Sequence, residues 1–168
     1  MDGAKSGDDA LRRRTLIVVV PIAPSVPVLA WGSADVLKSV PGIKVLVIDV
    51  PRGATDIGLT TERLQTVTEL KLRESGIKIL SQDEWNKTPG GPTLVIAVNI
   101  VGVGCSIDVS FREIVFVSRQ GKAVAIPNSE TWGRSVAGTT HTPEFVVDRE
   151  KELLDIFCND WLKANPRQ

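Results

Sequence analysis

The residues best suited to chemistry in this 168-residue chain are few and widely separated. There is a single histidine, His141, and the two cysteines, Cys105 and Cys158, lie far from each other in the sequence. A zinc site needs several His, Cys or carboxylate ligands gathered at short spacings. The sequence has no such cluster, so it predicts neither a metal site nor a bound cofactor.

Nucleophilic catalysis also finds little support in the sequence. A serine nucleophile would need His141 as its base. The G-x-S-x-G turn that exposes such a serine surrounds none of the candidates Ser106, Ser110, Ser129 and Ser135. The stretch GVGCSI (residues 102–107) begins like a dinucleotide-binding loop. It lacks the third glycine and runs into a strand pattern, so it predicts a hairpin turn.

An enzyme with an unfamiliar site is still an alternative, and it would use Glu69, Arg73 and His141. The first two are four residues apart on a predicted helix, in the order that favours an ion pair. The simpler interpretation is a solvated helix face, where such a pair contributes only a few tenths of a kcal/mol. A shared concave pocket would be needed to make these residues a site.

Binding residues are better candidates than catalytic ones. Trp85 and Trp132 both stand in polar, loop-like surroundings, and Arg52 lies in a loop with two glycines. Tryptophan is favoured at binding sites because it offers a large apolar area with one polar N–H group. The alternative for each tryptophan is that it folds back onto the core.

Two helices are predicted to frame these residues. Residues 59–76 begin with the caps Thr60 or Thr61 and end at Gly76, where a left-handed residue is favoured. The second helix starts at Thr142-Pro143, a cap followed by a first-turn proline, and runs to about Ala164. Both carry an apolar stripe opposite a charged face, so both are amphipathic.

The strand pattern surrounds the first helix and then continues as a meander. Apolar or alternating runs predict strands at residues 44–50, 77–80, 94–101, 107–117 and 122–126. A parity shift near Glu113 indicates a bulge, and Gln120-Gly121 marks a hairpin turn. Residues 128–140 are predicted as an edge strand or a loop. The order predicts an α+β domain, with one mostly antiparallel sheet of about five strands and two amphipathic helices on one face.

The N-terminal region has the features of an export signal. Arg12, Arg13 and Arg14 precede an uncharged apolar run, and small residues follow at Gly32-Ser33-Ala34. Pro21, Pro24 and Pro27 lack the N–H that a buried strand would donate. We therefore predict a signal peptide over residues 1–34 and a single domain over residues 35–168. A tether that stays attached, or a folded segment, are the alternatives.

The composition of the chain limits the classes of partner that it is expected to bind. Lys plus Arg equals Asp plus Glu, at 20 each, and aromatic residues make up only 5%. Such a chain lacks the basic surface and stacking platforms that nucleic acid needs. In an oxidising compartment Cys105 and Cys158 have two alternatives, a disulfide bond or two buried thiols.

Several stretches together resemble small exported bacterial proteins whose activity is not established. They are LTTERLQTVTELKLRESGIKIL followed by DEW, then ETWGRSVAGTT, then LLDIFCNDWLKANP. The resemblance covers residues 44–166 and implies an exported α+β domain, periplasmic or secreted, with no catalytic residue to carry over. The expected function is a non-catalytic binding module of the cell envelope with a protein partner. A hydrolase-type enzyme and a self-associating structural protein are the alternatives.

Overall fold

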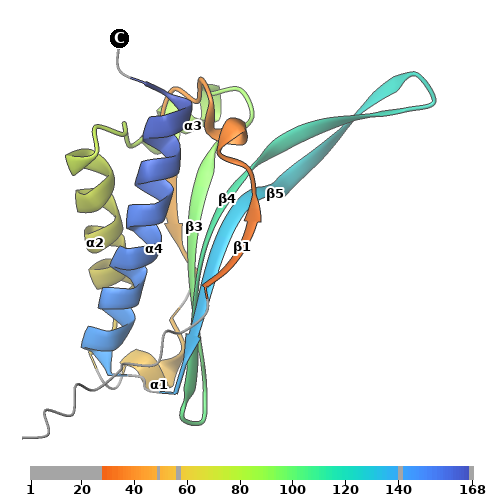
Figure 1. The fold of residues 1–168 in the computed structure, drawn as a ribbon. Helices are drawn as coiled ribbons and strands as arrows, with labels where there is room; N and C mark the ends of the chain where they lie inside the picture. Colours follow the sequence, from red (N-terminus) through yellow and green to blue (C-terminus); the bar gives the residue numbers. More distant parts are fainter. Residues whose placement is uncertain (1–27, 49, 56–57, 140–141, 167–168) are drawn as a thin grey trace, which may run out of the picture.

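A computed structural model of the chain describes residues 28–48, 50–55, 58–139 and 142–166 (Figure 1). One five-stranded sheet has the order β1-β5-β4-β3-β2, in which only β2 and β3 run parallel. Its strands are β1 (Val28–Gly32), β2 (Lys44–Val47), β3 (Thr93–Val101), β4 (Gly104–Arg119) and β5 (Lys122–Gly138). The predicted α+β class and mostly antiparallel sheet are confirmed.

Two long helices cover one face of the sheet, as predicted (Figure 1). They are α2 (Thr61–Glu74) and α4 (Pro143–Ala164). The described residues also form three short helices: η1 (Ala34–Leu37), α1 (Arg52–Thr55) and α3 (Gln82–Lys87). Thr60 and Thr142 cap α2 and α4 by accepting from the backbone N–H three residues on. Capping hydroxyls accept from backbone N–H groups that the helix leaves unpaired. The sequence could therefore predict a helix start at these two threonines.

The core lies between this helix pair and the sheet. β3 and β4 contribute alternate side chains to it, and α2 and α4 contribute their apolar stripes. The fully buried residues include Leu64 and Leu72 of α2, Leu153 and Phe157 of α4, and Trp132 of β5. Period-two strands facing 3.6-residue helices therefore produce one continuous core.

One predicted strand is wrong and another was not expected. Residues 77–80 form only an isolated bridge, between Ile79 and Ile43. The fifth strand is β1, which pairs antiparallel with the outer edge of β5 from Val28 opposite Val136 to Gly32 opposite Trp132. β1 falls inside the predicted signal peptide, whose cleavage after Ala34 stays a prediction. The three leader prolines and the rest of residues 1–27 lie outside the described residues.

β4 and β5 extend well past the rest of the sheet as a two-stranded ribbon, residues 113–128 (Figure 1). Its turn falls at Gln120-Gly121, with φ of 52° and 75°, so the predicted hairpin turn is confirmed. Positive φ at both central residues matches the twist of a hairpin. The predicted bulge is present as register shifts between Phe111 and Val115. The polar stretch beginning at Asn128 continues β5 rather than forming a loop.

Both faces of the ribbon carry apolar side chains, and among the described elements no helix lies over it (Figure 1). Phe116 is 72% exposed, and Ile114, Val124 and Ile126 are each more than a third exposed. None of the helices in the described ranges is both long and apolar enough to cross a membrane.

Candidate binding site

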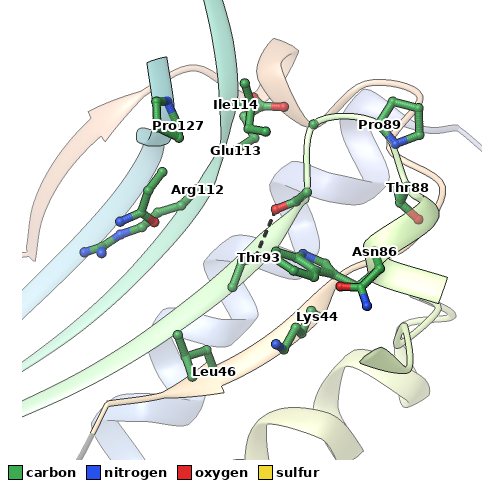
Figure 2. A pocket seen from close by; sticks show the side chains of 14 residues that line it. Lys44, Leu46, Asn86, Thr88, Pro89, Thr93, Arg112, Glu113, Ile114 and Pro127 are labelled. Atoms are coloured by element: carbon green, nitrogen blue, oxygen red, sulfur yellow. Dashed lines mark hydrogen bonds between the residues drawn. The ribbon is translucent and has the colours of Figure 1, made fainter. Parts of the chain in front are cut away.

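A cavity of about 660 Å³ opens on the sheet face that α2 and α4 leave uncovered (Figure 2). This size falls within the usual range for small-ligand pockets. β2 and β3 form its floor, α3 with the following loop forms one wall, and the base of the ribbon forms the other. The residues lining it include Lys44, Leu46, Trp85, Asn86, Thr88, Pro89, Thr93, Arg112, Glu113, Ile114, Pro127 and Asn128.

Trp85 is fixed in this cavity by its helix and by its own N–H group. Ser81 and Glu84 form a reciprocal capping box at the start of α3, which stabilises this short helix. The indole Nε1 donates to Thr93 Oγ1 at 3.1 Å, and that hydroxyl donates to the Gly91 carbonyl at 3.0 Å. The ring is therefore held in one orientation, with Lys44 Nζ over its face.

The loop after α3 is shaped around the same ring. Gly90 and Gly91 have φ of 83° and 57°, a region that side-chain-bearing residues rarely adopt. A Cβ on Gly91 would lie 3.3 Å from the Trp85 ring. The Gly90 carbonyl accepts from the N–H of Ile114 at 2.7 Å. This bond ties the loop to the ribbon and closes one end of the cavity.

Two cations face the cavity, and they differ in their partners. Lys44 Nζ lies 4.6 Å from the centre of the Trp85 ring and donates to Gln82 Oε1 at 2.7 Å. Within the described ranges, the contacts of the Lys44 ammonium are thus with neutral groups. Arg112 instead pairs with Glu130 at 3.2 Å. Lys44 is therefore the cation better placed to bind a carboxylate or another anion.

The bulge directs the residues at the ribbon base into the cavity. The register of β4 and β5 shifts on both sides of Arg112 and Glu113, and a bulge re-aims the side chains beside it. Glu113 Oε1 accepts from the Thr131 hydroxyl at 3.1 Å. The wall thus combines an anchored carboxylate with the apolar Ile114 and Pro127 (Figure 2).

Of the three predicted binding residues, Trp85 lines this site. Trp132 is fully buried on β5, and its Nε1 donates to Asp160 Oδ2 at 3.0 Å. The surface position predicted for Trp132 is therefore wrong. One of its polar sequence neighbours, Arg134, lies over the Trp132 ring at 4.6 Å and helps to cover it. Arg52 begins α1. Its role in binding stays a prediction.

A disulfide between the two cysteines is not formed, because both are buried as thiols. Cys105 pairs in register with Gly138, and a Cβ there would meet the ring of Phe145 at the start of α4. Cys158 lies on the same helix as Phe145. At a rise of 1.5 Å per residue, it is about 20 Å further along that helix. A disulfide requires Cα atoms within about 7 Å, so this fold keeps the cysteines apart.

Two residues of the enzyme alternative, Glu69 and Arg73, lie together on one face of α2. Arg73 Nη2 pairs with Glu69 Oε2 at 2.6 Å, and Gln65 Nε2 donates to Glu69 Oε1 at 2.9 Å. Both residues line a surface depression made by α2 side chains alone. The pair of Glu69 and Arg73 therefore fits the simpler interpretation, an ion pair on a solvated helix face. His141 lies outside the described residues.

Sequence reasoning missed Lys44, Arg112 and Glu113 as site residues. Lys44 was read only as the first residue of a strand, and Arg112 and Glu113 only as the place where a strand changes parity. The bulge was the available signal, since bulges are enriched beside functional sites. Across the described residues, no group of three or more His, Cys, Asp or Glu side chains is arranged to hold a metal ion.

Comparison with known proteins gives little further information. No family model matches the chain, and no curated protein matches it. Two similar solved structures are PelC dodecamers from Paraburkholderia phytofirmans. A variant form is 14% identical, with a TM-score of 0.41 over 84% of this chain and 98% of that chain. The other is 13% identical, with a TM-score of 0.40 over 84% and 99%.

Proposed function

We propose that this chain is an exported, non-catalytic binding module of the bacterial cell envelope, and that the cavity beside Trp85 holds its ligand. The observation that carries the proposal is the pairing of the fixed Trp85 ring with the Lys44 ammonium, 4.6 Å away. Convergent polar groups in an apolar hollow are the default mark of a binding site. The ligand class that fits is an amphipathic anion, with its apolar part on Trp85 and its negative group at Lys44.

The apolar part of the cavity supports the same ligand class. Leu46 is 46% exposed on the cavity floor, and Ile114 and Pro127 form the facing wall. Covering exposed apolar carbon contributes roughly 25 cal/mol per Å². A flat apolar group lying between these walls would release the water that now contacts them.

The binding proposal is tested with anilinonaphthalene sulfonate, whose aromatic rings and sulfonate match the two halves of the cavity. We expect one site by fluorescence titration. Trp85→Ala should raise the dissociation constant about tenfold, the equivalent of about 1.4 kcal/mol. Lys44→Met should raise it less, because only the electrostatic part is lost. Phe116→Ser is the matched control, because Phe116 is apolar and exposed but lies outside the cavity.

Equal affinities for wild type and Trp85→Ala would mean that the probe binds elsewhere and that the cavity is not the site. Loss of affinity in Phe116→Ser, with Trp85→Ala unchanged, would point to the ribbon instead. Thermal unfolding of each variant shows whether the fold is retained.

Export is supported by the order of charges, apolar residues and small residues in the leader. It is tested by the intact mass of the protein recovered from the native envelope fraction. A mass that matches a chain starting at Asp35 would support both export and the predicted cleavage. Recovery of the full-length mass from the cytoplasm alone would contradict them.

A further inference from the structure

Strand β1 pairs with the outer edge of β5, and Trp31 is its anchoring side chain. The Trp31 ring packs directly against Gly133, where any Cβ would overlap it. Its Nε1 donates to Glu130 Oε1 at 2.5 Å. Arg134 Nη1 donates to the Trp31 carbonyl at 3.0 Å. A slot, an acceptor for the indole N–H and a donor for the main chain are thus set side by side on one strand.

β1 itself is thinly packed, and the anchor in the core comes from Leu37 of η1, which follows it. All five residues of β1 are classed as exposed, and Trp31 itself is 39% exposed. Its ladder spans five residues of the 17 in β5. At Gly32, φ is 80° and the chain leaves the edge toward η1. In a short edge strand, main-chain bonds and one anchored side chain supply most of the attachment.

The edge of β5 continues beyond the point where β1 departs. From Glu130 toward Lys122 it runs into the ribbon, which in the described residues pairs only with β4. The ribbon exposes Val124 and Ile126 along this length. Unpaired edge N–H and C=O groups are templates for another strand, and such addition is an established mode of peptide recognition. A partner strand could therefore form more pairs than β1 does.

We propose that the β5 edge is a strand-acceptor site for an extended segment of a partner protein that carries a tryptophan. The tryptophan takes the slot over Gly133, with its N–H on Glu130, and the segment continues along the ribbon. β1 is the stand-in that covers this edge until the partner arrives. Cleavage after Ala34 would remove β1 and open the site permanently. This site is separate from the cavity at Trp85, although Arg112 contacts Glu130 and lines that cavity.

The test uses a fluorescein-labelled peptide of sequence PVLAWGSA, which is residues 27–34 of this chain, and the full-length protein. Fluorescence anisotropy measures its binding to wild type and to Trp31→Ala. The Trp31→Ala chain should bind the peptide at least tenfold more tightly, because its own strand no longer fills the slot. Adding Gly133→Ala to Trp31→Ala should remove that gain. A peptide with alanine in place of tryptophan should not bind.

Several outcomes would overturn the proposal. Equal peptide binding by wild type and Trp31→Ala would show that β1 does not occupy a competing site. Equal binding of the alanine peptide would show that the edge has no preference for tryptophan. A wild-type dimer in light scattering that is lost in Trp31→Ala would assign the site to a second copy and not to a separate partner. Circular dichroism and thermal unfolding check that each variant is folded.

Discussion

The indole ring of Trp132 stands edge-on to the phenyl ring of Phe157, with 5.0 Å between their centres and 74° between their planes. This contact joins β5 to α4 at the centre of the core, where both side chains are fully buried. Asp160 accepts from the indole N–H and also pairs with Arg134 at 3.1 Å. Edge-to-face geometry adds about 0.5–1.5 kcal/mol to the burial of such rings.

Replacing Trp132 should therefore destabilise the fold far more than replacing Trp85. We expect Trp132→Ala to lower the free energy of unfolding by about 3–5 kcal/mol, as large aromatic deletions in cores do. Trp85→Ala should cost much less, because Trp85 is only half-buried. Urea unfolding of both variants measures the difference. Similar losses for the two would contradict the assignment of Trp132 to the core.

Glu150 is a buried acid between α4 and α2, and its state should control the pH dependence of stability. Thr68 donates to its Oε1 at 2.7 Å, and Oε2 has no hydrogen-bond partner within the described residues. Burial raises the pKa of Glu150 from 4.5 to about 7, against the opposing effects of Thr68 and Lys151. The folded state therefore holds this proton more tightly than the unfolded state.

The sign of the effect follows from linkage. Below pH 4.5 Glu150 is protonated in both states and costs nothing. As pH rises toward about 7, the unfolded state loses its proton first, so stability falls by up to about 3 kcal/mol. Glu150→Gln should remove this fall. The exposed Glu152→Gln is the matched control, and equal pH profiles for wild type and Glu150→Gln would refute the prediction.

Both cysteines should behave as protected thiols. Burial raises the pKa of Cys105 and of Cys158, so neither supplies much reactive thiolate at neutral pH. Ellman's reagent should react slowly with the native protein and should titrate both thiols in denaturant. Rapid reaction of the native protein, or a mass two daltons low after isolation from an oxidising compartment, would contradict the distant placement of the two residues.

The ribbon should contribute little to the stability of the domain. Phe116 is 72% exposed, and exposed substitutions away from special features usually change stability by less than about 0.5 kcal/mol. Phe116→Ser should therefore leave the unfolding midpoint nearly unchanged. The buried Phe157→Ser is the matched comparison and should be strongly destabilising. A large loss in Phe116→Ser would mean that the ribbon packs against the body of the domain.

The sequence was sufficient for the elements whose signals are local. The caps at Thr60 and Thr142, the turn at Gln120-Gly121 and the bulge near Glu113 depend on residues close in sequence, and the structure has each of them. For the polar residues 128–140 the sequence left an edge strand and a loop as alternatives, and the structure has the strand as far as Gly138. The alternation of buried and exposed side chains in this stretch can be recognised only once α4 is known to cover one face of β5.

The candidate site was harder because it depends on pairings between distant residues. Trp85 was identified from its residue type, but Lys44 approaches it only because β2 lies parallel to β3, across a long connection. Trp31 meets Glu130 only because β1 pairs with the far end of the chain. Nothing in the spacing of either residue reveals such a neighbour.

The separation of the β4–β5 ribbon from the helices has a consequence for how this protein changes over time. Residues 114–126 make few packing contacts with the rest of the domain, so substitutions there meet few packing constraints. Selection on whatever these side chains touch can proceed without endangering the domain itself. Related chains should accordingly vary most in this projecting arm and least around Trp132 and Phe157.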